Sequence, residues 1–427
     1  MSITESAQAA KSASISLAAV STELKNKALD DIADALWQNR EKIISANEQD
    51  LAEAKKNNLA APLLKRLKFD EAKINQVIAG IESLINLEDP VGRTMAATEL
   101  DAGLELYKVT CPIGVIGIVF ESRPDALVQI STLCLKSGNA VLLKGGSEAA
   151  GTNKILAETI AEATSKAGLP KGWIQLLETR EDVAAMLALD EYIDLVIPRG
   201  SNEFVRYIMS NTNIPVLGHA DGICHVYVDG DADLEMAVDI TVDSKCQYVA
   251  VCNAAETLLV ANKIAGDFLP KVKAALEKNN CRLKGCEKTA AIIDIEPATE
   301  QDWATEYLDY ILSIKIVDSM EEAIEHINKY GSGHTDTIVT TDKEKAEKFM
   351  ALADSANVLW NCSTRFSDGF RYGLGAEVGI STNKIHARGP VGLEGLVIYK
   401  YKLLGSGQIV ADYSGDNAKK KFIHRKL

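Results

Sequence analysis

The chain has 427 residues, too many for one ordinary hydrophobic core, so we expect two or three domains. Its net charge of −14 and pI near 5.1 argue against general binding to nucleic acid or to an anionic membrane, because phosphate surfaces select basic faces. The N-terminus has no basic start followed by an apolar run, and no stretch approaches about 18 consecutive apolar residues. We therefore expect a cytoplasmic protein that enters no membrane and whose eight cysteines are reduced thiols.

A metal site is not expected from the sequence. Cys281 and Cys286 form a close pair, but no matching second pair or cluster of histidines follows them. His219 and His225 flank Cys224, yet the alternation of side chains along a strand would not point all three at one ion. We therefore predict no metal.

The region up to about residue 88 is predicted to be helical. Apolar residues recur with helical spacing over 29–56 and again over 71–87, and no strand pattern interrupts them. Asp89 and Pro90 close this region.

The next segment, 98–110, is predicted to be a β-hairpin. Its residues alternate in polarity and turn at Asp101-Ala102-Gly103. Because the edges of such a hairpin are exposed, it invites pairing with another chain.

From Pro112 onward, short apolar runs alternate with helical stretches. Such runs predict βαβ units and a parallel sheet. Pro124 stands where a first helical turn tolerates proline, and Gly138 and Gly168 stand where helices stop. Strands are expected at 113–120, 139–144, 173–179, 192–198 and 214–218.

A second α/β unit is expected after about Asp229. A helix is predicted over 231–245, and the basic residues 418–427 are predicted to form a solvated, mobile tail. Strands are expected at 256–261, 289–294, 311–317 and 336–341, with another edge strand at 395–404.

Four polar loops follow strands of the first unit. They are ESRP (121–124), GGSE (145–148), RGSN (199–202) and HADG (219–222). A doubly wound sheet binds nucleotides beyond the carboxyl ends of its strands, where backbone amides and helix N-termini face the phosphates. The loops therefore predict a nucleotide site, although the G-x-G-x-x-G fingerprint is absent and plain turns are the alternative.

Cys252 is the candidate nucleophile. A lone cysteine is most often a small buried hydrophobe. This one, however, lies between the predicted helix 231–245 and the strand 256–261, where a cleft between the two units would open. A thiolate there could attack a carbonyl and hold the acyl group beside a bound nicotinamide.

A cofactor sheet followed by a cysteine on a second α/β unit resembles the aldehyde dehydrogenase superfamily. The resemblance is closest to its γ-glutamyl phosphate reductase branch, and it spans the chain to about residue 405. The matching blocks are 63–67, 111–126 (CPIGVIGIVFESRPDA), 135–149, 194–202, 214–229, 251–260 (VCNAAETLLV), 330–340 and 363–396.

This resemblance implies an α/β fold with a doubly wound parallel cofactor sheet, a second α/β catalytic domain and a small oligomerisation hairpin. The expected parts are the N-terminal helices of the cofactor domain (1–97), the hairpin (98–111), the NADPH-binding domain (112–228), the catalytic domain (229–390), a C-terminal strand that pairs with the hairpin (391–411) and a basic tail (412–427).

The resemblance also implies an activity, the NADPH-dependent reduction of L-glutamate 5-phosphate to glutamate 5-semialdehyde and phosphate. This is the second step of proline synthesis from glutamate. Cys252 would form the thioester that accepts the hydride. Ser122 occupies the place of a superfamily oxyanion donor, and a plain helix cap is the alternative for it.

Cofactor residues follow from the same blocks. Lys144 matches the lysine that holds the adenosine ribose. At Ser147, NAD-specific relatives often carry a glutamate, so the absence of a carboxylate there favours NADPH. Gly200 and Ser201 match the turn near the pyrophosphate. Glu306 matches the glutamate that grips the nicotinamide ribose, with a solvent-facing helix position as the alternative.

The substrate carries a carboxylate, an ammonium and a phosphate, so cationic groups must face the cleft. Arg123 and Arg365 are the candidates, and Ser363 and Thr364 are expected to cradle the α-carboxylate. Two further arginines, Arg371 and Arg388, could equally be structural. His219 is expected to be structural or a neighbour of the cofactor.

Three functions compete at this point: the reductase; another superfamily enzyme acting on a different acyl phosphate or aldehyde; and a catalytically silent nucleotide-binding protein. A hydrolytic dehydrogenase would need a glutamate base where Val216 stands, and a silent protein would be expected to lose Cys252.

Two kinds of protein partner are expected. The hairpin and the edge strand suggest a homo-oligomer. Because acyl phosphates hydrolyse readily, transient contact with a separate glutamate 5-kinase is plausible, and we expect that kinase to be another chain because no kinase-length segment precedes residue 1.

Overall fold

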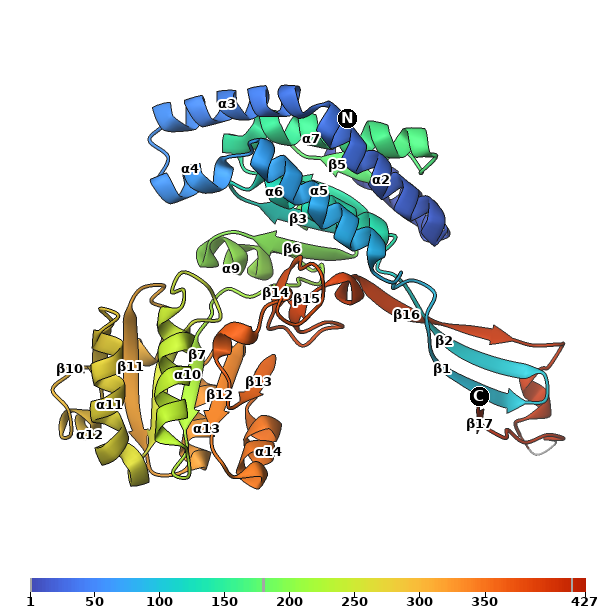
Figure 1. Cartoon of the computed structure of the whole chain (residues 1–427). Coiled ribbons are helices and arrows are strands. Elements are labelled where there is room, and N and C mark those ends of the chain that lie inside the picture. Colours follow the sequence, from blue (N-terminus) through green and yellow to red (C-terminus); the bar gives the residue numbers. More distant parts are fainter. Residues whose placement is uncertain (1, 179–180, 416–417) are drawn as a thin grey trace.

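The computed structural model describes residues 2–178, 181–415 and 418–427. Figure 1 shows three parts: N-terminal helices stacked on a first α/β layer, a second α/β domain below it, and an arm of antiparallel strands that extends to one side. None of the helices in the described part has the length and apolarity needed to cross a bilayer.

The N-terminal region is helical, as predicted. Its helices are α1 (Ile3–Leu17), α2 (Thr22–Gln38), α3 (Arg40–Lys56), α4 (Ala61–Leu67) and α5 (Glu71–Asn86). Ser2, Ser21 and Asp70 cap three of them, because each side chain accepts a backbone N–H from the first turn. The apolar faces of α1, α2, α3 and α5 join the hydrophobic core of the first sheet, whereas Leu67 of α4 belongs to a small separate cluster.

The first sheet is parallel, as predicted. Its strands are β3 (Val115–Phe120), β4 (Ala140–Lys144), β5 (Ile174–Leu176) and β6 (Leu195–Arg199), and its helices are α6 (Pro124–Lys136), α7 (Ala150–Ala167), α8 (Glu181–Leu187) and α9 (Asn202–Ser210). The strand order is β5-β4-β3-β6. The carboxyl ends of β3, β4 and β6 therefore lie at one edge, followed by three of the four polar loops.

The strand expected at 214–218 was wrong. Val216 makes a single bridge to Val196, and the Val196 N–H donates to the Pro215 carbonyl at 2.9 Å. Since Pro215 has no N–H of its own, the ladder cannot extend in the usual way and the segment remains a loop beside β6.

The second sheet has seven parallel strands in the order β10-β9-β11-β8-β7-β12-β13. Its strands are β7 (Cys224–Val228), β8 (Ala255–Ala261), β9 (Arg282–Gly285), β10 (Glu296–Pro297), β11 (Ile311–Val317), β12 (Thr335–Val339) and β13 (Asn357–Trp360). Its helices are α10 (Leu234–Cys246), α11 (Ala265–Glu277), α12 (Glu287–Ala290), α13 (Met320–Tyr330) and α14 (Lys343–Leu352). Hydrophobic clusters cover both faces of the sheet.

Two expectations for this second unit need correction. The strand β7 pairs with β8 and β12 in the middle of the second sheet, so this sheet begins before the boundary expected at residue 229. The expected strand at 289–294 is instead the end of α12 and a turn. Thr289 and Ile293 are buried, whereas Ala291, which an alternating strand would also bury, is exposed, so the burial follows a helical rather than an alternating pattern.

The arm contains the predicted hairpin. Its strands are β1 (Thr94–Asp101), β2 (Leu104–Pro112), β16 (Val397–Leu404) and β17 (Arg425–Lys426), in the order β16-β2-β1-β17, while β14 (Gly379–Ser381) and β15 (Gly389–Val391) form a separate small sheet. The expected edge strand at 395–404 is confirmed by the pairing of β16 with β2.

The C-terminal segment is not the free tail that its basic composition predicted. The strand β17 pairs with β1, and the Ile423 and Leu427 N–H groups donate to the carbonyls of Leu100 and Ala97. The Tyr413 and Phe422 rings stack with centroids 4.6 Å apart. Backbone pairing and ring stacking therefore hold this segment against the outer edge of the hairpin.

Candidate active site

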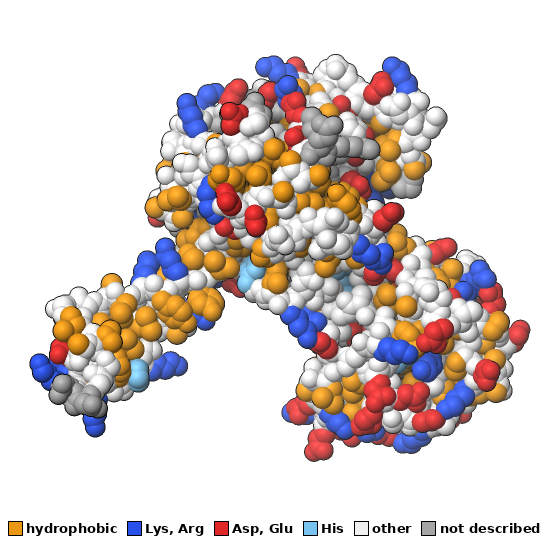
Figure 2. All heavy atoms as spheres, turned by 180° about the vertical axis from the view of Figure 1, so that it is seen from behind, with side chains coloured by type: hydrophobic (Ala, Val, Ile, Leu, Met, Phe, Trp, Pro, Cys, Tyr) orange, Lys and Arg blue, Asp and Glu red, His pale blue; other side chains and the backbone are white. Residues whose placement is uncertain are grey.

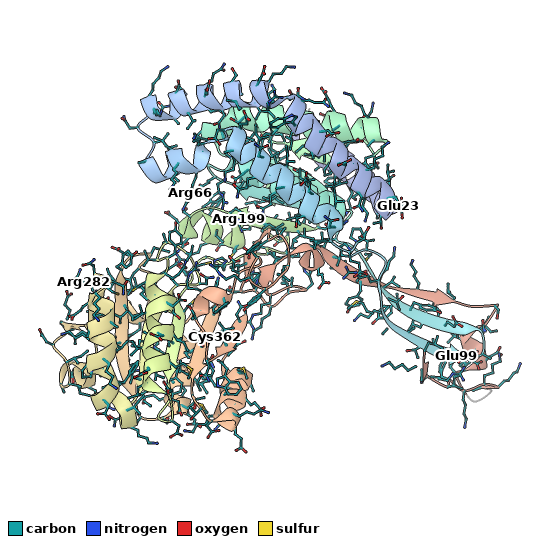
Figure 3. The ribbon with its side chains drawn as sticks, in the orientation of Figure 1. Glu23, Arg66, Glu99, Arg199, Arg282 and Cys362 are labelled. Atoms are coloured by element: carbon teal, nitrogen blue, oxygen red, sulfur yellow. The ribbon has the colours of Figure 1, made fainter. Side chains whose placement is uncertain are left out.

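Cys252 lies in the loop between α10 and β8, at the amino end of the second sheet, and it is half-buried. Arg199 ends β6 of the first sheet, and Figure 3 labels it on the side of the first domain that faces the second. The guanidinium and the thiol are close enough to influence each other's ionisation. The candidate nucleophile therefore faces the carboxyl edge of the first sheet, as the sequence predicted.

The backbone at Cys252 is packed against Gly222. A Cβ atom on Gly222 would lie 2.1 Å from the Cys252 carbonyl oxygen and 2.4 Å from its Cα, far inside contact distance. The Cys224 thiol, at the start of β7, also donates to the Cys252 carbonyl at 3.2 Å. The position of the nucleophile is thus fixed from the neighbouring strand.

The thiol of Cys252 is protonated at neutral pH in the free protein. Burial, followed by the carboxylates of Glu306 and Glu377, raises its pKa to about 12, whereas Arg199 opposes the rise. A slowly reacting thiol in the free protein therefore does not show that Cys252 is merely structural.

The alkylation of Cys252 is expected to keep accelerating with pH. Below its pKa the thiolate fraction grows tenfold per pH unit, so the rate should still rise at pH 9.5, where an ordinary cysteine approaches its plateau. The rate at pH 7 should be roughly a thousandfold below that of a free cysteine. Iodoacetamide labelling from pH 6 to 9.5, followed by peptide mass spectrometry, measures this; a plateau below pH 8 would contradict it.

Two histidine rings face the thiol. One nitrogen of His219, one of His334 and the Cys252 Sγ all lie within 4.8 Å of one another. Burial lowers the pKa of both imidazoles, for His334 well below its usual value, so both are neutral at pH 7. The sequence predicts His219 only as structural or a cofactor neighbour, and no local pattern in it points to His334.

Glu377 is a second group that no pattern in the sequence pointed to. Its carboxylate accepts the Gly369 N–H at 2.8 Å, and burial raises its pKa. Val216, by contrast, is buried in the hydrophobic core of the first domain, so it offers no base to the cleft.

Lys144 and Ser147 lie at the carboxyl end of β4. The buried Lys144 ammonium donates to the Gly145 carbonyl. Ser147 begins a short 3₁₀ helix (Ser147–Ala149) and is exposed. The next residue, Glu148, has its carboxylate turned to Ser122, so no carboxylate of this loop is aimed outward from Ser147.

The loop after β6 meets the second domain through Asn202. Its amide donates to Glu306 at 2.6 Å and to Asp221 at 3.0 Å. Gly200 is exposed, and Ser201 caps α9 by accepting the Phe204 N–H. This arrangement joins the predicted pyrophosphate turn to Glu306.

The alternative for Glu306, a solvent-facing helix position, was wrong. Glu306 lies outside any helix, and burial raises the pKa of its carboxyl. Glu306 also belongs to the groups that raise the Cys252 pKa, so it borders the candidate active site.

Ser122 does not present a free donor. Its N–H and hydroxyl both donate to one oxygen of Glu148, at 2.6 Å each, and its φ of 45° lies in the left-handed region. The cap alternative was also wrong, since Arg123 is the N-cap of α6. The oxyanion role of Ser122 remains a prediction.

Ser363, Thr364 and Arg365 form a buried turn against α10. The Ser244 hydroxyl donates to Ser363 Oγ at 3.3 Å and accepts the Thr364 N–H at 3.1 Å. The Thr364 hydroxyl is buried without a partner, and the Arg365 Nε donates to Gln247 at 3.0 Å. Burial, reinforced by Arg371, lowers the pKa of Arg365, and the Cys252 thiol is among the groups that act on it.

The other three arginines considered from the sequence differ in their surroundings. Arg123 is about half-exposed, 3.6 Å from Asp125, and lines a pocket with Lys73. Arg371 forms an ion pair with Asp368, and Arg388 forms one with Asp354. These contacts fit the structural alternative that the sequence offered for both arginines.

Comparison with known proteins agrees with this geometry. Residues 1–290 match the model of the aldehyde dehydrogenase family. The chain is 68% identical to the gamma-glutamyl phosphate reductases of Acetivibrio thermocellus and Pelotomaculum thermopropionicum over 427 residues, covering 100% of this chain and 99% and 98% of theirs. The chain belongs to the gamma-glutamyl phosphate reductases of the aldehyde dehydrogenase family.

A solved structure agrees with this family assignment. The crystal structure of gamma-glutamyl phosphate reductase from Thermotoga maritima superposes with a TM-score of 0.93 at 43% identity, covering 95% of this chain and 99% of that one. The resemblance identified from the sequence and the expected aldehyde-dehydrogenase-like α/β fold are therefore confirmed.

Proposed function

We propose that the enzyme reduces L-glutamate 5-phosphate to L-glutamate 5-semialdehyde and phosphate, with NADPH, as the second step of proline synthesis. The observation that supports this most directly is the full-length identity of 68% to gamma-glutamyl phosphate reductases, together with an intact Cys252 block at the edge of the first sheet.

Cys252 is the nucleophile in this proposal. Its sulfur attacks the acyl phosphate, phosphate leaves, and the thioester is then reduced to a hemithioacetal that collapses to the aldehyde and the thiolate. The thiol proton must leave before or during attack. His219 and His334 each offer an imidazole nitrogen within 4.8 Å of the Cys252 sulfur, so we propose that one of the two receives it.

The charged substrate needs donors around the cleft. Arg365 and Arg123 are the proposed partners of its anionic groups, and the unpartnered Thr364 hydroxyl, beside Ser363, is a proposed donor to the α-carboxylate. The Cys252 backbone N–H and Ser122 are the proposed oxyanion donors, and Ser122 would first have to be released from Glu148.

The residues at the end of β4 fit NADPH. The cofactor supplies the hydride when bound. Lys144 and the exposed Ser147 would hold its adenosine ribose, Gly200 and Ser201 its pyrophosphate, and Glu306 its nicotinamide ribose. Because Ser147 carries no charge and Glu148 is turned to Ser122, a 2′-phosphate meets no repulsion there.

The substitution Ser147→Glu is expected to weaken NADPH binding much more than NADH binding. A carboxylate about 4 Å from the 2′-phosphate would cost on the order of 1 to 4 kcal/mol. Dissociation constants by fluorescence titration measure the change, with Ser147→Gln as a neutral control of similar size. Equal loss of both cofactors would show that Ser147 does not face the ribose.

Oxidation of the semialdehyde tests the proposed function itself. The position of the hydrolytic base holds Val216, so we expect phosphate rather than water to release the acyl group. NADPH formation from glutamate 5-semialdehyde and NADP⁺ should therefore require inorganic phosphate and stop near one turnover without it. Sustained turnover in phosphate-free buffer would favour a hydrolytic dehydrogenase instead, and inactivity on this aldehyde would favour a relative acting on another acyl phosphate.

We also propose that the enzyme is a homo-oligomer assembled through its arm. Figure 2 shows hydrophobic side chains along the arm, and the outer strand β16 exposes Tyr399, Tyr401, Leu403 and Leu404. Analytical ultracentrifugation tests this, because a monomer would contradict it. Transient contact with a separate glutamate 5-kinase is proposed from the lability of the acyl phosphate, and a pull-down with that kinase tests it.

A further inference from the structure

The cluster of His219, Cys252 and His334 has the composition of a metal site. One ligand atom from each residue lies within 4.8 Å of the other two. His334 is fully buried, whereas His219 and Cys252 are only partly buried. Whether the two rings can bind a metal ion depends on which of its two nitrogens each ring protonates, because only the other nitrogen offers a lone pair to the cluster.

His219 has a fixed tautomer. Its Nδ1 lies 2.8 Å from the Ile380 carbonyl oxygen, which can only accept a hydrogen bond. The proton is therefore on Nδ1 and the lone pair on Nε2. A backbone carbonyl that holds the second ring nitrogen in this way is the usual support of a metal-binding histidine.

His334 has the same tautomer for a different reason. The Ser367 hydroxyl donates to the Thr364 carbonyl at 3.1 Å, so the Thr335 hydroxyl, 2.7 Å away, donates to Ser367. The Thr335 oxygen must then accept from His334 Nδ1 at 2.8 Å. The lone pair is on Nε2, which is buried and has no hydrogen-bond partner.

We propose that Nε2 of His219, Sγ of Cys252 and Nε2 of His334 bind a soft divalent cation such as Zn²⁺, and that the bound cation inhibits the enzyme reversibly. Tetrahedral zinc, with bonds of about 2.0 to 2.3 Å, places its ligand atoms about 3.3 to 3.7 Å apart, so atoms up to 4.8 Å apart must close by at most about 1 to 1.5 Å. The cation forms a bond to sulfur, and the thiol proton leaves to solvent.

Two properties of the cluster favour this class of ion. Thiolate and imidazole ligands select zinc-like cations over Mg²⁺ and Ca²⁺, which prefer oxygen. Because each ring carries its proton on Nδ1 and leaves the Nε2 lone pair free, only the thiol proton competes with the metal. Three protein ligands leave a fourth position open to water.

Metal binding can be tested without activity. The chelator-treated enzyme is titrated with Co²⁺, which reports a thiolate ligand by a near-ultraviolet charge-transfer band and tetrahedral geometry by intense visible bands. We expect one equivalent to bind, one equivalent of Zn²⁺ to abolish the bands, and Mg²⁺ to leave them unchanged. Failure of wild type to develop the bands at millimolar Co²⁺ would overturn the proposal.

Variants assign the ligands. Cys252→Ser should lose the charge-transfer band, and His219→Asn should weaken Co²⁺ binding by about a hundredfold or more. His219 is chosen because it is only partly buried, and circular dichroism reports its folding. The matched controls His386→Asn, an exposed ring, and Cys286→Ser, a thiol at the end of β9, should bind as wild type does. A band that survives Cys252→Ser would place the metal elsewhere.

The inhibitory consequence rests on the proposed function. Micromolar Zn²⁺ should stop turnover and excess EDTA should restore it fully. If Co²⁺ binds as expected but the enzyme is inactive on the semialdehyde even without metal, the metal site stands and the proposed function fails. If Zn²⁺ binds with no effect on an active enzyme, the inhibition is refuted.

Discussion

Replacement of Cys252 by alanine is expected to abolish turnover while leaving NADPH binding nearly unchanged. The thiol is the proposed covalent nucleophile, whereas the proposed cofactor residues lie on the loops after β4 and β6 and near Glu306. Removing a nucleophile of this kind costs far more than a thousandfold in kcat. Steady-state kinetics and a fluorescence titration with NADPH measure the two properties separately.

The control for this variant is Cys286→Ala, which should retain most of its activity because that thiol contacts Thr289 at the far side of the second domain. Cys224 is not a suitable control, since its thiol donates to the Cys252 carbonyl. Activity of Cys252→Ala above roughly a thousandth of wild type would remove Cys252 from the nucleophile role.

The substitution Gly222→Ala is expected to lower kcat by about a hundredfold or more. An added methyl group would stand 2.1 Å from the Cys252 carbonyl oxygen, and this neighbour is backbone that cannot swing aside. Cys252 must therefore shift, and a displacement of about 1 Å from a productive geometry can cost a hundredfold in rate. Kinetic measurement of kcat and KM, together with Tm, distinguishes displacement of the nucleophile from unfolding.

Gly266→Ala is the matched control, because a methyl group there meets nothing within 4 Å. It lies in the exposed part of α11, where alanine is also the better helix former. If Gly222→Ala folds normally and keeps wild-type kcat, the packing at Gly222 does not position the nucleophile.

Much of the fold could be predicted because most strands are short apolar runs with clear stops. The run over 113–120 is fully buried as β3 from Val115 to Phe120, and the alternating segment 98–110 is indeed a hairpin. The apolar run 289–294 was wrongly predicted to be a strand, because it contains no residue type that would mark it as a helical turn instead. Only the exposure of Ala291 between the buried Thr289 and Ile293 distinguishes the two, because an alternating strand would bury all three.

The candidate active site could be predicted only where its residues lie in one continuous block. Cys252 was identified from its place between a helix and a strand. His219 and His334 are far apart in the sequence and meet only because β7 and β12 are neighbours in the sheet. Similarly, nothing local pairs Ser122 with Glu148, a contact that changes how Ser122 can act.

The two edges of the arm sheet differ, and this difference bears on how many chains can join through the arm. On one side β17 covers β1 at Thr98 and Glu99, and further backbone bonds reach Leu100 and Ala97. On the other side β16 is the outermost strand. A sheet that can be extended at both edges supports open-ended growth of a filament, whereas a sheet with one edge occupied by its own chain can accept a foreign strand on one side only. In the proposed homo-oligomer, the C-terminal segment would therefore act as a terminator that leaves only the β16 edge open to strand addition, which limits the arm to a closed assembly.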